Sequence, residues 1–487
     1  MAAVLAVMMV LPLIVSCSDT CSDAESSTAT QWVTETEEDS FLEIDSYVSD
    51  LVLSSGGFDG SAFNIISSEM SVLPETMEET GSLENDTLYK RQRDIEELFG
   101  VKMELSKATG IGYEDVEHEI NDLVRRDVMS DSRTYDLIEA NIMLCGTYML
   151  ESDLIQPSDN FDAIDPEQSW WISGIRERYT ICDKLYYLTG KINVTNYSAP
   201  ACVLFNKTVA ENFGIYGMYD HVKNGTWTLD RMLESASPIT AGSDVKRFMI
   251  GGAGGGLSML FAAGFTLSSY DENGDPVLPD SLGNDMVSYI DKLADSFGDD
   301  SITYNQMRAY YNGAEQFVDT DTFENGRVLY WVDVLGTAVD MRKYDVEFGI
   351  LPIPKRDENQ KEYIGFANAW QVKGVLFPKN VKDSEMTGVI TEAMAALSEK
   401  HLEPAYLEKS LKGRSTFDHE SREVVDILYN NQIADLADTY QWADIVVVIN
   451  KACLGVIDSY VSSYVGSVAF ARIQIRKLLA NVKNREG

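Results

Sequence analysis

The sequence is poor in the residues that build disulfide scaffolds and metal centres. It has six cysteines and four histidines among 487 residues, and no two cysteines stand in a C-x-x-C pair. Disulfide-rich scaffolds need many paired cysteines and zinc sites need clustered Cys or His, so neither class is indicated. We therefore expect no metal and no cofactor.

Basic residues are also scarce, with 39 Lys and Arg against 78 Asp and Glu. The formal net charge of −39 would repel the phosphates of a nucleic acid and an anionic membrane surface. Nucleic acid is therefore excluded as a partner, and an anionic ligand would need a local basic pocket. We expect the membrane to be contacted through an anchor only.

Long apolar runs are limited to the N-terminus. The run at residues 2–15 is shorter than the roughly 20 residues of a membrane-spanning helix, but it suits the apolar region of a secretion signal. It leads to Cys17, which follows Ile14, Val15 and Ser16. This ending resembles the bacterial lipobox, in which the signal is cut before the cysteine and the cysteine receives lipid. We predict a lipoprotein signal peptide at 1–16, lipidation at Cys17, and a location on the extracellular face of the bacterial cell membrane.

The rest of the chain divides into a polar spacer and an α/β region. Residues 17–60 are rich in Ser, Thr, Asp and Glu without sustained periodicity, which predicts a flexible tether. Beyond them, apolar runs at 63–67, 101–105 and 135–141 alternate with amphipathic stretches at 84–99 and 114–129. The second half repeats this order of strands and helices. Such alternation predicts parallel α/β sheets, whose ligands bind at the carboxyl ends of the strands.

Several segments carry a resemblance to a known family. They are TYDLIEAN, GKINVTNYSAPACVLFNKTVAENFGI, YDHVKNGTWTLDRM, FENGRVLYWVDV and FGILPIPKRDENQKEY, which follow the lipobox in this order. The combination resembles the extracellular solute-binding proteins of the carbohydrate type (family 1) that serve bacterial ABC importers. The resemblance implies a two-lobed periplasmic-binding-protein-like clamshell of type II, with a three-segment hinge. It also implies a carbohydrate ligand between the lobes, delivery to permease subunits, a monomer, and no catalysis.

The same resemblance sets the expected boundaries. Lobe 1 would comprise residues 61–197 plus 366–425, and lobe 2 residues 200–362 plus 430–487. The hinge crossings would fall near 197–202, 363–368 and 419–431.

A sugar offers hydroxyls for planar polar groups and a C–H face for aromatic rings, so a site needs Trp or Tyr beside Asp, Asn or Glu. Mixtures of this kind occur at the predicted strand ends and hinge crossings. The predicted ligand residues are Ser68, Glu69, Asn141, Tyr197, Trp331, Asp333, Asn368 and Trp370. We assign Trp227 to packing, and leave Trp170 and Trp171 undecided between a cleft wall and the core.

Other interpretations stay open. A secreted glycan hydrolase or a surface glycan adhesin would also combine carboxylates with aromatic residues. A bridge between Cys182 and Cys202 competes with free buried thiols, which we favour. The segment DENGDPVLPD resembles half of a calcium loop, but Pro276 stands where that loop requires Gly, so we predict a hairpin turn.

Overall fold

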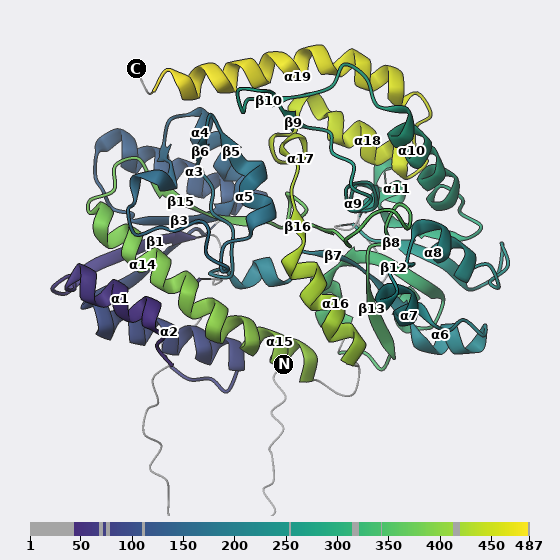
Figure 1. Ribbon diagram of the computed structural model, residues 1–487, viewed down its shortest axis with the longest axis horizontal. Coiled ribbons are helices and arrows are strands. Elements are labelled where there is room, and N and C mark those ends of the chain that lie inside the picture. Colours follow the sequence, from purple (N-terminus) through teal and green to yellow (C-terminus); the bar gives the residue numbers. More distant parts are fainter. Residues whose placement is uncertain are drawn as a thin grey trace, which may run out of the picture. The chain divides into compact units, whose positions relative to one another are not determined.

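A computed structural model describes residues 43–67, 72–74, 78–109, 113–252, 255–313, 321–341, 343–412 and 419–485 (Figure 1). The described residues all belong to one compact unit, Phe41–Gly487. The predicted signal, Cys17 and the predicted ligand residues Ser68 and Glu69 lie outside the described residues. Within the described part, no helix is long and apolar enough to cross a bilayer.

The first of two five-stranded sheets has the order β2 (Val101–Lys107), β1 (Ser61–Ser67), β3 (Leu137–Asn141), β15 (Lys373–Pro378) and β4 (Ile155–Gln156). β1 pairs in parallel with β2 and β3, as the alternation of strands and helices predicts. β15 runs antiparallel to β3 and β4. In Figure 1, β15 lies among the purple and blue elements of the early chain, although it comes from much later in the sequence.

Helices and short elements surround this sheet. They are α2 (Leu83–Phe99), α3 (Tyr113–Ser130), the π-helical turn η1 (Ile142–Gly146), α4 (Thr147–Glu151), η2 (Ser158–Asn160), α5 (Ser173–Tyr179), β5 (Thr180–Ile181), β6 (Lys184–Leu185), η3 (Val194–Tyr197), α14 (Ser384–Leu397), η4 (Ser398–Leu402) and α15 (Glu403–Lys412). α2 forms where predicted, because its apolar residues recur at helical spacing. It ends at Gly100, which takes a left-handed φ of 62° that favours glycine.

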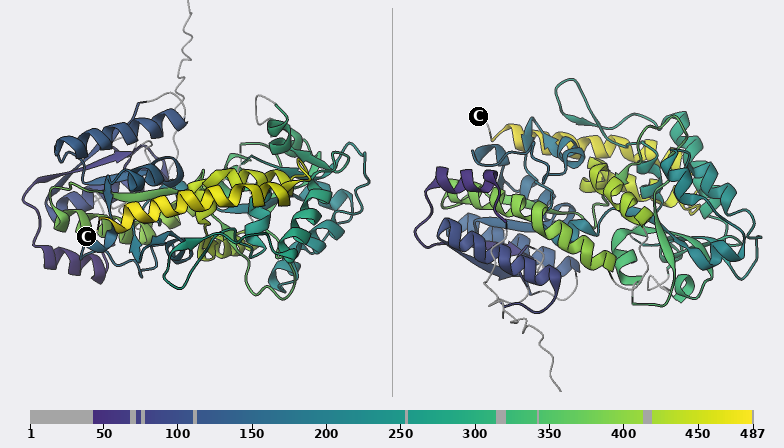
Figure 2. Two further views of the ribbon diagram at one scale, coloured as in Figure 1. Left: turned by 90° about the horizontal axis from the view of Figure 1, so that it is seen from above. Right: turned by 60° about the horizontal axis from the view of Figure 1, so that its bottom comes forward.

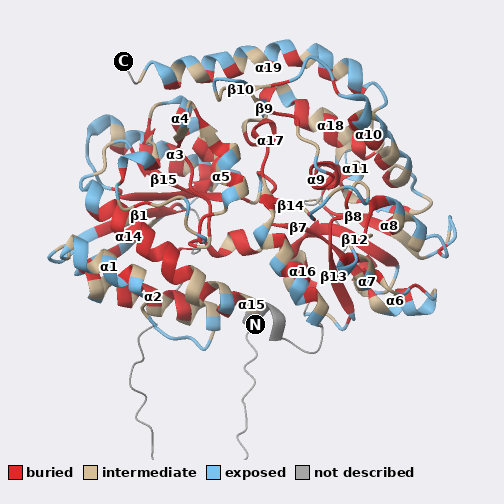
Figure 3. Cartoon of the chain, in the orientation of Figure 1, coloured by how far each residue is buried: buried red, intermediate tan, exposed pale blue. Residues whose placement is uncertain are grey.

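The second sheet has the order β11 (Thr303–Asn305), β8 (Lys246–Ile250), β12 (Val328–Val334), β7 (Ala201–Asn206) and β13 (Phe348–Pro352). β8, β11 and β12 are parallel, and β7 runs antiparallel to β12 and β13. β7, β12 and β13 of this sheet are buried along their whole length (Figure 3). Its helices are α6 (Lys207–Asn212), α7 (Met218–Lys223), α8 (Leu229–Ser235), α9 (Gly255–Ala262), α10 (Asn284–Phe297), α11 (Gln306–Tyr311), α12 (Asp321–Glu324) and α13 (Leu335–Met341).

Two of the predicted crossings connect the sheets where expected. η3 leads into β7, and the short strand β14 (Gly365–Phe366) lies between β13 of the second sheet and β15 of the first. β14 pairs in parallel with β16 (Gln432–Ile433).

The third expected crossing needs a correction. Residues up to 425 were assigned to lobe 1, but α16 (His419–Asn430) packs against β13 of the second sheet. Its Ser421 hydroxyl accepts the backbone N–H of Ile350 at 3.1 Å and shares a hydrogen bond with the Tyr219 hydroxyl at 2.9 Å. Burial of one apolar face of α16 on β13 therefore decides its place, which chain order alone does not reveal.

The C-terminal elements are α17 (Leu436–Tyr440), η5 (Trp442–Asp444), α18 (Ile445–Cys453) and α19 (Tyr460–Lys483). Figures 1 and 2 show α19, in yellow, extending from the side of α10 toward the side of α4. The Tyr460 hydroxyl donates to Asp291 of α10 at 2.7 Å, and Arg485 pairs with Asp153, which follows α4, at 3.1 Å. The end of the chain therefore contacts elements that surround the first sheet. The expectation that residues 430–487 belong to lobe 2 alone is corrected by this contact.

The predicted tether at 17–60 is wrong for its last part, because Ser46–Ser55 forms the helix α1. The Asp45 side chain caps α1 by accepting the N–H of Val48 at 3.0 Å. α1 packs on α14, where the Tyr47 hydroxyl donates to the buried Glu392 carboxylate at 3.1 Å. Val48 is fully buried as well, so a few apolar residues in a polar stretch suffice to order it.

The Glu392 carboxylate also decides the place of two tryptophans. The indole N–H groups of Trp170 and Trp171 donate to it at 3.0 and 3.1 Å. Both rings are buried, so they belong to the core and not to a cleft wall. Burial raises the pKa of Glu392 to about 7.

Three smaller expectations are confirmed. The Trp227 ring is fully buried, and its N–H donates to the Pro352 carbonyl at 2.9 Å. The hairpin β9 (Ser269–Tyr270) and β10 (Pro276–Val277) encloses the turn predicted at DENGD. The cysteines of the described residues, Cys145, Cys182, Cys202 and Cys453, are free thiols, as favoured.

Candidate functional site

The carboxyl edge of the first sheet presents a shaped loop. β3 ends at Asn141, and the antiparallel β15 begins opposite it at Lys373, so the loop 367–372 lies at this edge. The fully buried Asn141 side chain donates to the carbonyls of Ala369, Trp370 and Val372 at 2.9, 3.3 and 3.2 Å. Its amide oxygen accepts the N–H of Leu144 at 2.8 Å. Asn141 therefore positions the loop from beneath.

Asn368 and Asp438 fix the same loop from within and from the C-terminal elements. The Asn368 side chain accepts the N–H of Trp370 at 2.9 Å, and the Asp438 carboxylate accepts the N–H of Ala369 at 3.0 Å. Trp370 itself is 43% exposed, whereas Asn368 is 8% exposed. A large aromatic side chain is thus held at the surface by a hydrogen-bonded turn, which keeps its position defined.

A buried ion pair lies behind this edge. Lys373 Nζ contacts the Glu117 carboxylate of α3, and the two side chains are 2% and 0% exposed. The other carboxylate oxygen of Glu117 accepts the N–H of Asn141 and the thiol of Cys145, each at 3.0 Å. Burial and the Glu117 charge raise the pKa of the Cys145 thiol well above its ordinary value, so this thiol stays protonated and is no nucleophile.

The end of β1 is joined to the first crossing by a second buried carboxylate. Glu139 of β3 accepts hydrogen bonds from the Ser67 hydroxyl and from the Asn193 side chain. Ser67 is the last residue of β1, and Asn193 precedes η3. The strand end that leads to Ser68 and Glu69 is therefore tied to the segment that enters the second sheet.

The predicted ligand residues at the carboxyl edge of the second sheet are buried, unlike Trp370 at the first sheet. Trp331 is 3% exposed and its ring lies 5.5 Å from that of Phe323. Asp333 is 6% exposed and accepts its own following N–H, that of Val334, at 2.8 Å. Gly251 covers both side chains, since a Cβ at that position would lie 1.8 Å from the Asp333 carboxylate. Trp331 and Asp333 come together here, but inside the protein.

The backbone N–H groups at the start of α9 have hydrogen-bond acceptors within the protein. The Asn450 side chain of α18 accepts the N–H groups of Gly256 and Leu257 at 2.9 and 3.3 Å, and donates to the Tyr311 hydroxyl at 3.1 Å. Tyr310, near the end of α11, is 48% exposed, and Tyr304 of β11 is 44% exposed. Tyr310 is not among the predicted ligand residues, although the pair Tyr310 and Tyr311 follows a few residues after the end of β11.

Tyr197 belongs to the crossing and not to an open surface. It is 2% exposed and stacks on Tyr406 at 5.2 Å. Its hydroxyl donates to the Lys191 carbonyl at 2.7 Å, and its carbonyl accepts the Tyr429 hydroxyl at 2.6 Å. Burial raises the pKa of Tyr197 well above its ordinary value. This ring therefore packs elements of both sheets together.

α17 connects the two sheets, which the sequence did not reveal. Asp435 accepts the N–H groups of Leu267 and Ser268 at 2.9 and 3.1 Å on the second-sheet side. On the first-sheet side, the Thr439 hydroxyl donates to Tyr179 at 3.1 Å, and the Tyr440 hydroxyl lies 2.9 Å from that of Tyr187. Burial raises the pKa of Asp438, on the same helix, to about 7.

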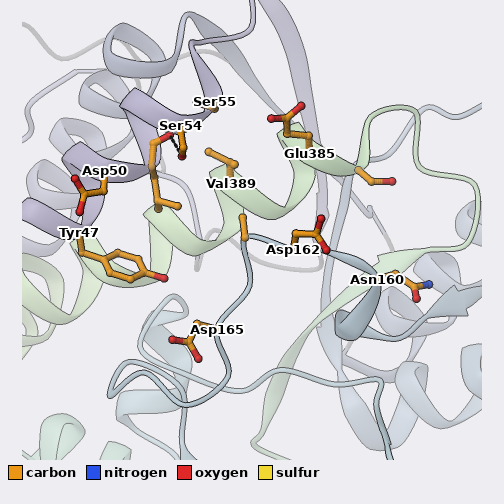
Figure 4. Close-up of a pocket in the computed structure, with 12 residues that line it drawn as sticks. Tyr47, Asp50, Ser54, Ser55, Asn160, Asp162, Asp165, Glu385 and Val389 are labelled. Atoms are coloured by element: carbon orange, nitrogen blue, oxygen red, sulfur yellow. Dashed lines mark hydrogen bonds between the residues drawn. The ribbon is translucent and has the colours of Figure 1, made fainter.

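A separate depression lies away from these edges. It has a volume of about 800 Å³ and is lined by α1, the segment 160–165 and the start of α14. Figure 4 shows Asp50, Asp162, Asp165 and Glu385 around it. None of the predicted ligand residues lines it. Among the described residues, no group of three or more His, Cys, Asp or Glu is arranged to hold a metal ion.

The chain is similar to known proteins in its structure, whereas comparisons of its sequence find no match. No protein-family model and no curated protein matches the chain. An ABC substrate-binding protein from Listeria monocytogenes in complex with cycloalternan has a TM-score of 0.52 at 12% identity, over 87% of this chain and 100% of its own. A cyclo/maltodextrin-binding protein complexed with maltotetraose has a TM-score of 0.53 at 12% identity, over 86% of this chain and 98% of its own.

A sugar transporter protein from Rhizobium etli, in an open conformation, has a TM-score of 0.53 at 15% identity, over 87% of this chain and 99% of its own. At such identities the similarity establishes the fold. The chain has the α/β fold of type II periplasmic binding proteins, and the fold class expected from the sequence is confirmed.

Proposed function

We propose that this chain is an extracellular solute-binding protein that captures a sugar or oligosaccharide between its two α/β lobes. The observation that carries the proposal is the exposed Trp370, which a hydrogen-bonded turn holds at the carboxyl edge of the first sheet. In α/β sheets, ligands bind at this edge. A fixed aromatic face beside polar groups is what the C–H face of a pyranose binds.

The fold supports the same proposal. The solved structures that share it include proteins whose titles name cycloalternan and maltotetraose as ligands. In this chain the buried thiol of Cys145 is protonated, and the Glu117 carboxylate is engaged by Lys373, so the edge is suited to binding and not to nucleophilic chemistry. We therefore favour a binding protein over the glycan hydrolase.

The delivery step and the anchor belong to the proposal as well. Bound sugar would be passed to the permease subunits of an ABC importer, which read the closed arrangement of the lobes. Lipid on Cys17 would hold the protein at the extracellular face of the membrane. A Cys17→Ser variant should move from the membrane fraction to the medium, and retention of this variant in the membrane would contradict the anchor alone.

The first test is a thermal-shift screen of the chain from Phe41 onward against mono- and oligosaccharides. A ligand at about 100 times its dissociation constant should add about 2.7 kcal/mol to the free energy of unfolding. The same mixtures are examined for cleavage products. A shift without cleavage supports the proposal, whereas cleavage of a bound glycan would replace it with the hydrolase.

Trp370→Ala then tests the site. We expect the dissociation constant to rise about tenfold, a loss of about 1.4 kcal/mol, because one aromatic contact is removed. The matched control is Tyr216→Ala, an aromatic residue that is 71% exposed elsewhere. Equal affinity of the two variants would show that Trp370 does not contact the ligand.

A further inference from the structure

The outer face of α19 is unusually apolar for a solvent-facing helix. Four of the twelve large apolar side chains that are exposed among the described residues lie on it: Val461, Val465, Phe470 and Ile473. The opposite face already supplies the core with Tyr464, Val468, Ala471, Ile475, Leu478 and Val482. The exposed apolar side chains are therefore not needed for folding, and residues 459–471 contain no charge.

These side chains form one continuous surface. Val465, Ala469 and Ile473 follow each other at intervals of four, and Gly466 and Phe470 fill the adjacent row. All five are exposed, and Figure 3 shows exposed residues along the outer edge of α19. Open space surrounds Gly466, because a Cβ there would have no neighbour within 4 Å.

Charges of opposite sign lie at the two ends of this surface. Asp458 is exposed just before α19, and Arg476 and Lys477 are exposed in its last turns. The nearby basic residues Arg472 and Lys483 are already paired with Asp280 and Asp275, at the β10 side of the helix. Along the chain the outer face is therefore acidic, then apolar, then basic.

We propose that this face binds the same face of a second copy of the chain, with the two α19 helices antiparallel about a two-fold axis. A two-fold interface must be self-complementary, and an acidic–apolar–basic order is complementary to its own reversal. Reversal about the midpoint between Ser467 and Val468 places Asp458 opposite Lys477 and Val465 opposite Phe470.

The same reversal places Gly466 opposite Ala469, so the helices cross where the side chains are smallest. Small residues at a crossing let two helices approach closely. This pairing goes beyond the proposed function and does not depend on it, and it departs from the monomer that the family resemblance implies.

A groove beside α19 enlarges the surface available to the second copy. It has a volume of about 670 Å³ and lies between α19 and the β9–β10 hairpin, with Val277, Leu278, Ala469 and Leu479 in its lining. The 24-residue helix is about 36 Å long, which supplies part of the roughly 800 Å² per partner that a stable interface buries. The groove, whose lining also includes Asp271, Asp275, Arg472 and Arg476, provides further surface along the helix.

The test is sedimentation velocity of the chain from Phe41 onward, which forms one compact unit, over a range of protein concentrations at about 150 mM salt. We expect a reversible equilibrium between monomer and dimer. Phe470→Ser should raise the dimer dissociation constant at least about tenfold, because the side chain is central and apolar. Tyr216→Ser, which removes an equally exposed aromatic residue elsewhere, should leave the constant unchanged.

A charge reversal tests the antiparallel register. Asp458→Lys and Lys477→Asp should each weaken the dimer about tenfold, and the double variant should recover to within about threefold of the original. Circular dichroism confirms that each variant is folded.

Three outcomes overturn the proposal. They are a chain that stays monomeric at every concentration, a dimer that Phe470→Ser leaves intact, and a double variant without recovery. Binding of the monomer to anionic vesicles through α19 would replace the second copy by a lipid surface.

Discussion

Trp331 and Trp370 stand in similar sequence patterns, but one is buried in the structure and the other is exposed. Trp331 lies within β12 and is 3% exposed against Phe323, whereas Trp370 lies in a loop before β15 and is 43% exposed. Both stand beside polar residues at a sheet edge, Asp333 and Asn368 respectively. A strand residue is covered by its neighbours on both sides of the sheet, whereas a loop residue at the edge meets solvent.

The two edges differ in the same way as the two tryptophans. The first-sheet edge rests on buried polar groups, Asn141, Glu117 and Lys373, that shape a loop. The second-sheet edge is closed by the approach of Gly251 to Trp331 and Asp333. The proposed ligand contact is therefore Trp370 on the first-sheet loop, and the predictions below test this division.

The largest effect should come from Trp331→Ala. Removing a buried indole leaves a cavity, and we expect a loss of about 3–5 kcal/mol in the free energy of unfolding, measured in urea. Trp370→Ala should change the stability by less than about 0.5 kcal/mol. Similar losses for both variants would remove the distinction between the two rings.

Lys373→Met tests the buried ion pair behind the edge of the first sheet. It leaves the buried Glu117 carboxylate without its partner, and we expect a loss of about 3 kcal/mol or more. The double variant Glu117→Gln with Lys373→Met should regain most of that loss, because no uncompensated charge remains. Additive losses in this double-mutant cycle would show that the two side chains act independently.

Asn141→Ala should cost about 2 kcal/mol, because the three carbonyls of the loop lose their donor inside the protein. Sugar affinity should fall with it, since the loop that holds Trp370 is released. Hydrogen exchange at 369–372 measures the release directly. Unchanged exchange in this loop would mean that Asn141 does not position it.

The remaining prediction is a pH dependence from Asp438. Its pKa is raised from 3.8 to about 7 in the folded protein, mainly by burial. The folded state therefore binds the proton more strongly than the unfolded state does. The proton's contribution to the free energy of unfolding is complete below pH 3.8 and is lost as the pH rises toward 7. Asp438→Asn should flatten the fall in stability between these values, and an unchanged pH profile would contradict the raised pKa. Asp131→Asn, at an exposed carboxylate, is the control.

The sequence predicted those parts of the fold that rest on local patterns. α2 and its stop at Gly100 follow from helical spacing and a residue suited to a left-handed φ. The β9–β10 hairpin follows from its turn residues. α1 was missed because the sequence around it is polar, and only its contact with α14 shows that Val48 is a core residue and that Tyr47 packs against the core.

The candidate site was less predictable for a physical reason. Strand ends can be read from the sequence, so Asn141, Asn368 and Trp370 were found together at one edge. Burial cannot be read in this way, so Tyr197 and Trp331 were assigned to the ligand although they pack inside. Asp438, which holds the loop from α17, lies about 70 residues further along the chain and carries no local signal.

By itself, the sequence determined the alternation of strands and helices and the excess of negative charge. These properties depend on composition and on neighbours a few residues apart. Only the tertiary structure decided which aromatic rings meet solvent, that α16 packs on the second sheet, and that α17 and α19 join the two sheets. Such contacts bring distant residues together, and their free energy comes from burying surface that no local pattern specifies.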